Sequence, residues 1–236
     1  MPDVRPVFVK HQPRHCPPLG ELYSLPLAYG TAPAGLKWSP DGRTLAFLWN
    51  AEGGLRMDAY VARAGATAPE RLTDAAAVAA LPREDDEREA EDVAYAERMY
   101  PGVTALDWSA DSQTLYYRCR GDLFRVAAAG GAPVRLTQSA AGRGNLQVSP
   151  DGRRVGFVQG GNLWAYDTPT GALVQVTYFS KADMAVERYA WSPDGRWAAV
   201  VVEDRSGLDV VKMPDYTPLK GVKIHELRRD NVGRPL

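Results

Sequence analysis

The serines of this chain do not stand in a pattern that would make one of them a catalytic nucleophile. None occupies the centre of a G-x-S-x-G sequence, the strand-to-helix turn that exposes an activated serine. Ser206, in EDRSGLD, comes nearest to an exposed position, but it follows Asp and Arg in a loop between two expected strands. A reactive serine needs a neighbouring base and an oxyanion hole. We therefore predict that this chain contains no catalytic residue.

The histidines and cysteines offer one spacing that could bind a metal ion. His11, His15 and Cys16 are spaced as ligands on a helix would be, but the prolines at 13, 17 and 18 oppose a helix there. The third histidine, His225, stands alone in KIHEL. No glycine-rich phosphate loop follows an expected strand and opens a helix. The sequence predicts neither a metal site nor a bound cofactor.

Acidic residues gather in REDDEREAEDVAYAERMY at 83–100. This segment is rich in helix formers, follows Pro82 and precedes PG, so we expect a helix near 84–100 within an insertion at 74–103. Clustered carboxylates can bind a cation or an amine, although a charged helix is more often a solvated face. The candidate substrate-binding residues are Glu89, Glu91, Asp92, Glu97 and, outside this segment, Glu187.

The overall composition excludes several classes of partner. The net charge is −1, with bases scattered among acids, so no nucleic-acid partner is expected. Apolar runs such as WAAVVV are far shorter than a membrane span, and the N-terminus has no secretory core. The two cysteines lie far apart in sequence and suggest no disulfide framework. We expect a soluble cytoplasmic protein, with a periplasmic or secreted location left open if a signal peptide was removed.

The most informative pattern is an internal repeat. SPDG stands at 39–42, 149–152 and 192–195, and a degraded copy, SADS, stands at 109–112. The regular step between copies is about 40 residues, the length of one four-stranded unit in repeat proteins. GDLF and GNLW begin 12 residues after their serines, and RLT and QVT end 28 residues after them. In the first copy the matching landmarks are MDAY and RLT, displaced by six residues.

Each copy has the composition of a hairpin turn between short strands. Pro presets the second position of a type I turn, Asp suits the third, and Gly tolerates the left-handed conformation that follows. The turn residues are Ser39, Pro40, Asp41, Gly42, Ser149, Pro150, Asp151, Gly152, Ser192, Pro193, Asp194 and Gly195. Bulky residues precede the turns (Trp38, Trp108, Val148 and Trp191), and we expect them at one recurring position in the packing between sheets.

The repeat predicts an all-β fold, a β-propeller of four-stranded blades with one short helical insertion. We expect blades near 36–73, 104–137, 145–177 and 188–227, about four blades that form part of a larger ring. Residues 1–35 are an N-terminal segment that could supply a strand to a neighbouring blade, and 228–236 are a truncated tail. An arc that does not close exposes apolar faces at both ends, so self-association into a homo-oligomer is also expected.

Three stretches carry a family resemblance: LKWSPDGRTLAFLWN, GDLFRVAAAGGAPVRLT and the run from YFSKADMAVERYAWSPDG to KMPDY. Together they resemble the N-terminal propeller of the dipeptidyl-peptidase IV branch of the prolyl oligopeptidase family, over about 36–216. The SPDG units alone are equally similar to TolB-like propellers. The resemblance implies an eight-bladed propeller over an α/β-hydrolase domain, where it screens peptides by size and supplies a glutamate pair for the substrate amino terminus. This chain has only Glu187 in the corresponding segment.

Two functions follow from the resemblance. The first is the non-catalytic propeller portion of a dipeptidyl-peptidase-IV-like serine peptidase. Its partners would be the α/β-hydrolase domain of the same polypeptide and peptide substrates. The alternative is a free-standing TolB-like propeller that binds another molecule or protein.

Overall fold

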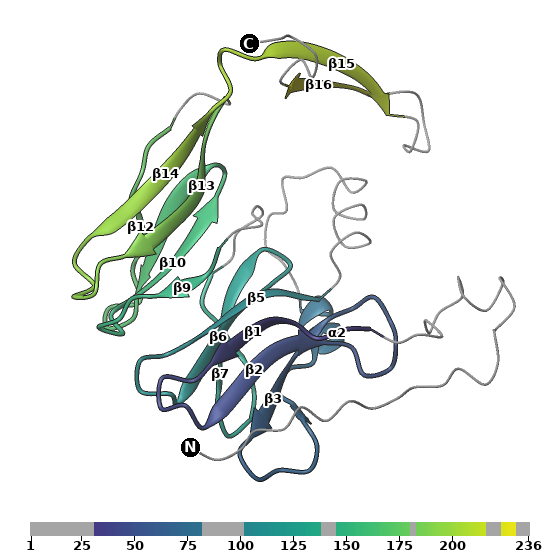
Figure 1. The fold of residues 1–236 in the computed structure, drawn as a ribbon, viewed down its shortest axis with the longest axis vertical. Helices are drawn as coiled ribbons and strands as arrows, with labels where there is room; N and C mark the ends of the chain where they lie inside the picture. The colour runs from purple at the N-terminus through teal and green to yellow at the C-terminus, as the bar shows by residue number, and fades with distance from the viewer. Residues whose placement is uncertain (1–30, 82–101, 138–144, 180–182, 216–222, 230–236) are drawn as a thin grey trace, which may run out of the picture.

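The fold is built from antiparallel sheets that follow one another along the chain. The computed structural model describes residues 31–81, 102–137, 145–179, 183–215 and 223–229 (Figure 1). Blade 1 comprises β1 (Ala34–Trp38), β2 (Thr44–Trp49), β3 (Asp58–Arg63) and β4 (Glu70–Arg71). Blade 2 comprises β5 (Val103–Trp108), β6 (Thr114–Cys119), β7 (Asp122–Ala127) and β8 (Val134–Arg135). Blade 3 comprises β9 (Gln147–Val148), β10 (Arg154–Gln159), β11 (Asn162–Asp167) and β12 (Leu173–Gln175).

Each of these blades is a meander in which every strand pairs with the next one along the chain. The only described helix, α2 (Ala75–Ala79), follows blade 1 and is capped by Asp74, whose carboxylate accepts the amides of Ala76 and Ala77. The all-β architecture of four-stranded blades with a helical element in the insertion is confirmed. The helix expected near 84–100 lies outside the described residues.

The fourth unit differs from the expected blade. It consists of two hairpins, β13 (Met184–Trp191) with β14 (Ala198–Asp204), and β15 (Asp209–Asp215) with β16 (Lys223–Arg229). In the described residues β14 does not pair with β15, and the second hairpin extends away from the first (Figure 1). We call β13–β14 the terminal hairpin. Its first strand begins at Met184, ahead of the expected start at 188.

The connection between strands two and three also differs between these units. In blades 2 and 3 these strands are joined by two residues with positive φ, Arg120 and Gly121 (55° and 86°) and Gly160 and Gly161 (55° and 74°). Two positive φ values in a two-residue loop define the turn that matches the natural twist of paired strands. No described residue at 205–208 has a positive φ, so this hairpin turn is missing between β14 and β15.

The SPDG turns have the expected geometry and explain the recurrence of their letters. In the first turn, the Ser39 hydroxyl donates to an Asp41 oxygen at 2.6 Å, and that oxygen accepts the Arg43 amide at 3.0 Å. The Ser39 oxygen accepts the Thr44 amide at 3.0 Å, and Gly42 has a φ of 69°. The same serine–aspartate bond forms in the turns at 109, 149 and 192. The hydrogen bond from the serine lowers the pKa of all four aspartates.

The core consists of three apolar layers, one at each junction between successive sheets. At two junctions the tryptophan before the turn also bonds to the preceding blade. The Trp108 ring nitrogen donates to the Lys37 carbonyl at 3.0 Å, and the Trp191 ring nitrogen donates to the Gln147 carbonyl at 3.2 Å. Val148, which replaces tryptophan in blade 3, has no ring nitrogen. At that junction an Asp107 carboxylate oxygen accepts the Val148 amide at 2.9 Å.

A fully buried arginine occupies the junction between blades 2 and 3. Arg118 donates to the carbonyls of Val158 at 3.0 Å and Gly121 at 2.6 Å, and its guanidinium lies 5.0 Å from the centre of the Phe157 ring. Burial lowers the pKa of Arg118 to about 10, so the side chain remains a cation at neutral pH. Its hydrogen bonds and its ring contact offset part of the cost of burying that charge.

Candidate functional site: the inner-strand groove

The first strands of blades 1, 2 and 3 and of the terminal hairpin line a common groove. This inner-strand groove has a volume of about 520 Å³ and receives residues from blades 1, 2 and 3 and from the terminal hairpin. Most of the lining comes from β1, β5 and β13 and from the residues at and just before β9, and Leu48 of β2 and Val158 of β10 complete it. The lining residues are Gly35, Lys37, Leu48, Thr104, Ala105, Leu106, Asn145, Leu146, Gln147, Val158, Val186 and Glu187.

The groove presents polypeptide backbone as well as side chains. Among the described residues, β1, β5, β9 and β13 each pair along one edge only, with the second strand of their own sheet. On the other edge some groups are bonded to neighbouring segments, such as the Val103 amide to the Met57 carbonyl and the Val186 amide to the Gly161 carbonyl, each at 2.8 Å. The remaining amide and carbonyl groups of this edge can bond to an extended peptide. The Asn145 side chain donates to the Glu187 carbonyl at 3.3 Å, and the Gln147 side chain donates to the Tyr189 carbonyl at 3.0 Å. Amide side chains therefore link blade 3 to the terminal hairpin along the groove.

A charged link joins the inner strands of the first three blades. The Lys37 ammonium lies 3.7 Å from one oxygen of Asp107, and the other oxygen accepts the Val148 amide. The Asp107 side chain is only 18% exposed. Burial raises the pKa of this carboxyl, while the Val148 amide and Lys37 act in the opposite direction. The link therefore ties β1, β5 and β9 together beside the groove.

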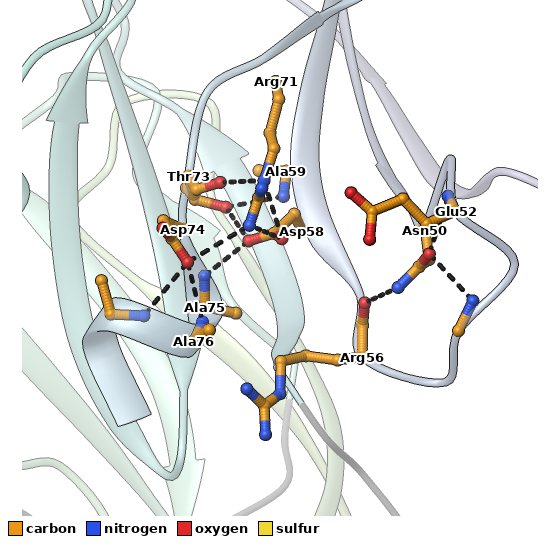
Figure 2. A network of polar contacts seen from close by, with 12 residues as sticks. Asn50, Glu52, Arg56, Asp58, Ala59, Arg71, Thr73, Asp74, Ala75 and Ala76 are labelled. Carbon is orange, nitrogen blue, oxygen red and sulfur yellow. Dashed lines mark hydrogen bonds and ion pairs between the residues drawn. The ribbon is translucent and has the colours of Figure 1, made fainter. Parts of the chain in front are cut away.

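A second polar site lies at the outer strands of each blade. In blade 1, Arg71 bonds to an Asp58 oxygen at 2.7 Å, and the other Asp58 oxygen accepts the Thr73 hydroxyl at 2.8 Å and the Ala75 amide at 2.7 Å (Figure 2). Thr73 in turn accepts the Ala59 amide at 2.9 Å. We call this set the clasp: in blade 1 it consists of Asp58, Arg71 and Thr73, and in other blades of the residues at the equivalent positions.

The clasp recurs with different chemistry along the chain. Blade 2 repeats the ion pair, with Arg135 and Asp122 at 2.7 Å. In blade 3 the equivalent positions hold Asn162 and Gln175, whose amides replace both charges. The sequence landmarks GDLF, GNLW, RLT and QVT contain these residues, but their pairing was missed. The sequence signal for this pairing was that Asp and Arg in blade 2 are both replaced in blade 3, by Asn and Gln.

These features place the chain among known propellers. Residues 117–229 match the family model described as the dipeptidyl peptidase IV N-terminal region. Dipeptidyl peptidase 4 of Porphyromonas gingivalis is similar at 16% identity, over 83% of this chain and 28% of that one, with a TM-score of 0.56. A TolB-like protein of Agrobacterium tumefaciens is similar at 18% identity, over 85% of this chain and 63% of that one, with a TM-score of 0.53.

The comparisons confirm the resemblance to both kinds of propeller. TolB of Acinetobacter baumannii is similar at 17% identity, over 85% of this chain and 45% of that one, with a TM-score of 0.50. At these identities the solved structures show a shared fold. The chain spans less than two thirds of the length of these three proteins.

The structure describes one of the five predicted substrate-binding residues. Glu187 lies exposed on β13 and lines the groove. Glu89, Glu91, Asp92 and Glu97 lie outside the described residues, as do His11, His15 and Cys16. The groove itself was missed, because its lining comes from residues scattered between 35 and 187.

Ser206 and Cys119 are two potential nucleophiles within the described residues. Ser206 is exposed, and its amide donates to the Asp204 carboxylate at 2.9 Å. Cys119 is buried, and burial raises the pKa of its thiol to about 12, which disfavours the reactive thiolate. Within the described ranges no group of three His, Cys, Asp or Glu side chains could hold a metal ion. No helix of these ranges is long and apolar enough to cross a membrane.

Proposed function

We propose that this chain is the non-catalytic propeller portion of a dipeptidyl-peptidase-IV-like serine peptidase. In this role it docks on an α/β-hydrolase domain and controls which peptides reach that domain. The observation that carries the proposal is the groove, which combines strand edges that pair with no further strand among the described residues with Glu187, inside the segment that matches the family model. Bonds to peptide backbone do not depend on sequence, so such a groove suits substrates that vary in their side chains.

Glu187 supplies a charge for the substrate amino terminus. Its side chain is exposed on β13, and Lys37 is the other charged residue among those that line the groove. Lys37 is already 3.7 Å from Asp107, which leaves Glu187 as the acid available to an incoming ammonium group. A peptide with a free amino terminus therefore binds more tightly than the same peptide with an acetylated terminus.

A peptide-binding experiment tests this proposal. An unstructured peptide labelled at its carboxyl end is titrated with the chain, in free and acetylated forms, and fluorescence anisotropy reports binding. We expect Glu187→Gln to remove the preference for the free terminus. Glu70→Gln is the matched control, because it removes the same charge from the exposed outer strand β4. If no extended peptide binds, or if both variants behave alike, the proposal fails.

The second candidate is a TolB-like module that binds another protein. It is favoured by the two TolB-like structures, each of which matches 85% of this chain. A fluorophosphonate probe distinguishes the two functions when it is applied to the product of the entire gene. Labelling of a serine outside residues 1–236 supports the peptidase, whereas a product without any labelled serine supports the binding module.

A further inference from the structure

Successive sheets meet through a large residue and a small one. We call the face of a sheet that meets the following sheet its front face, and the opposite face its back face. The residue before each turn, a tryptophan in every unit except blade 3, lies on the back face of its sheet. The residue seven positions after each turn serine lies on the front face. Trp191 packs against Gly156, where an added Cβ would lie 2.9 Å from the ring. Trp108 shares its apolar layer with Ala46 in the same way.

At the junction between blades 2 and 3 the large and small residues exchange places. The front face of blade 2 carries a large residue, Tyr116, at the position held by Ala46 in blade 1 and by Gly156 in blade 3. The residue that packs there from blade 3 is Val148 in place of tryptophan. Each of the three junctions thus combines one bulky and one smaller partner, as dense packing requires.

Two faces of these sheets leave one partner of this kind exposed. On the back face of blade 1, Trp38 is 65% exposed and Leu36 is 58% exposed. Trp108, its counterpart at the first junction, is only 3% exposed. On the front face of the terminal hairpin, Ala199 occupies the small position and is exposed, and Val201 beside it is 43% exposed.

These two faces complement each other. Ala199 pairs with Ala190 across β13 and β14 in the register that Ala46 and Lys37 have in blade 1. The Lys37 carbonyl accepts the bond from Trp108, so the Ala190 carbonyl holds the equivalent position for a tryptophan from outside. Trp38 and Ala199 thus correspond to Trp108 and Ala46, the two residues that meet at the junction between blades 1 and 2.

We propose that this protein associates head to tail, with Trp38 of one copy packed on Ala199 of a second copy. The new junction continues the array, because it uses the same faces as the internal ones. The Trp38 ring covers Ala199 and Val201, and its ring nitrogen donates to the Ala190 carbonyl. Tryptophan anchors of this kind dominate the binding energy of protein interfaces. The association buries exposed apolar residues on both faces.

The test measures the mass of the 236-residue chain over a dilution series by light scattering. We expect at least twice the monomer mass of 25.8 kDa at high concentration, decreasing on dilution. Trp38→Ser and Ala199→Trp should each reduce association at least tenfold, since one deletes the anchor and the other fills its site. Both positions are exposed, so folding is retained, which circular dichroism verifies. Val174→Ser is the control, because it removes an exposed apolar residue of the outer strand β12.

Mixing the two variants identifies the junction. Trp38→Ser retains the site around Ala199, and Ala199→Trp retains Trp38, so the mixture can form one native junction that neither variant forms alone. A heterodimer in the mixture supports head-to-tail contact. A wild-type chain that stays monomeric overturns the proposal, as do oligomers or aggregates that Trp38→Ser leaves unchanged.

Discussion

Blades 2 and 3 have the same strand order but differ in charge at the clasp. In both, the third strand begins with an amide bonded to a threonine hydroxyl at 2.9 Å, Leu123 to Thr137 and Leu163 to Thr177. In blade 2, Arg135 donates to the Thr137 carbonyl at 3.1 Å, and in blade 3, Gln175 donates to the Thr177 carbonyl at 2.8 Å. The same backbone bonds are made with and without the ion pair.

This comparison indicates that the positions of the hydrogen-bonding groups, more than their charges, determine which bonds the clasp makes. Asp122 and Asn162 have similar shapes, and each begins a third strand. The Asp122 carboxylate accepts from Arg135 at 2.7 Å, and the Asn162 amide oxygen accepts the Thr177 hydroxyl at 3.1 Å. The charges of blade 2 must therefore occur together, because a buried carboxylate or guanidinium without its partner is costly. The neutral pair of blade 3 avoids that risk. Substitutions that convert one blade into the other test this interpretation.

The largest expected effect comes from breaking the ion pair of blade 2. The Asp122 and Arg135 side chains are 3% and 17% exposed, so Asp122→Ala leaves a largely buried guanidinium without its carboxylate. We expect a loss of about 3 kcal/mol in the free energy of unfolding, measured by urea denaturation. The double variant Asp122→Asn with Arg135→Gln copies blade 3 and should lie within about 1 kcal/mol of the wild type. A double variant as unstable as Asp122→Ala would contradict the shape interpretation.

The second effect concerns the junction between the two blades. Val148→Trp gives blade 3 the tryptophan that blade 2 has at position 108, but the receiving residue is Tyr116. Two bulky side chains then compete for one space, and we expect a loss of about 2 kcal/mol. Adding Tyr116→Ala restores the large and small pairing found at the first junction and should recover part of that loss. No recovery would show that the junctions are not equivalent.

The repeated letters predicted features within one repeat better than features assembled from several. The turns and most strand positions follow from local chemistry, since Ser39 and Asp41 bond within the same few residues. The groove required knowing how four first strands meet, and Lys37 and Glu187 are 150 positions apart. The divided fourth unit lacks the two-residue turn of blades 2 and 3, a feature that the repeat landmarks do not include. The clasp could have been predicted from the sequence, because Asp122 and Arg135 of blade 2 are both replaced in blade 3, by Asn162 and Gln175.

The third prediction is one in which the two blades should agree. Hydrogen bonds from Ser109 and Ser149 lower the pKa of Asp111 and Asp151. A pKa lowered on folding contributes stability that is present above the unfolded pKa, about 3.9, and is lost as the pH falls through the folded value. Stability should therefore decrease below about pH 4. Ser109→Ala and Ser149→Ala should reduce this pH dependence equally, as measured by urea midpoints at several pH values. Unequal slopes would show that the two turns differ.

The smallest effects are expected at the last turn position, where blade 2 has Ser112 and blade 3 has Gly152. Both adopt positive φ, 62° for Ser112 and 71° for Gly152, a conformation that costs a residue with a Cβ about 1 kcal/mol. Gly152→Ser should lose about 1 kcal/mol, because its Cβ would also lie 3.2 Å from that of Ala110. Ser112→Gly relieves the same strain but removes the hydroxyl that accepts the Asp41 amide of blade 1 at 3.1 Å. Such a hydrogen bond contributes about 1 kcal/mol, so this variant should be nearly as stable as the wild type. If Ser112→Gly instead gained as much as Gly152→Ser loses, the bond between the blade 1 and blade 2 turns would contribute nothing to stability.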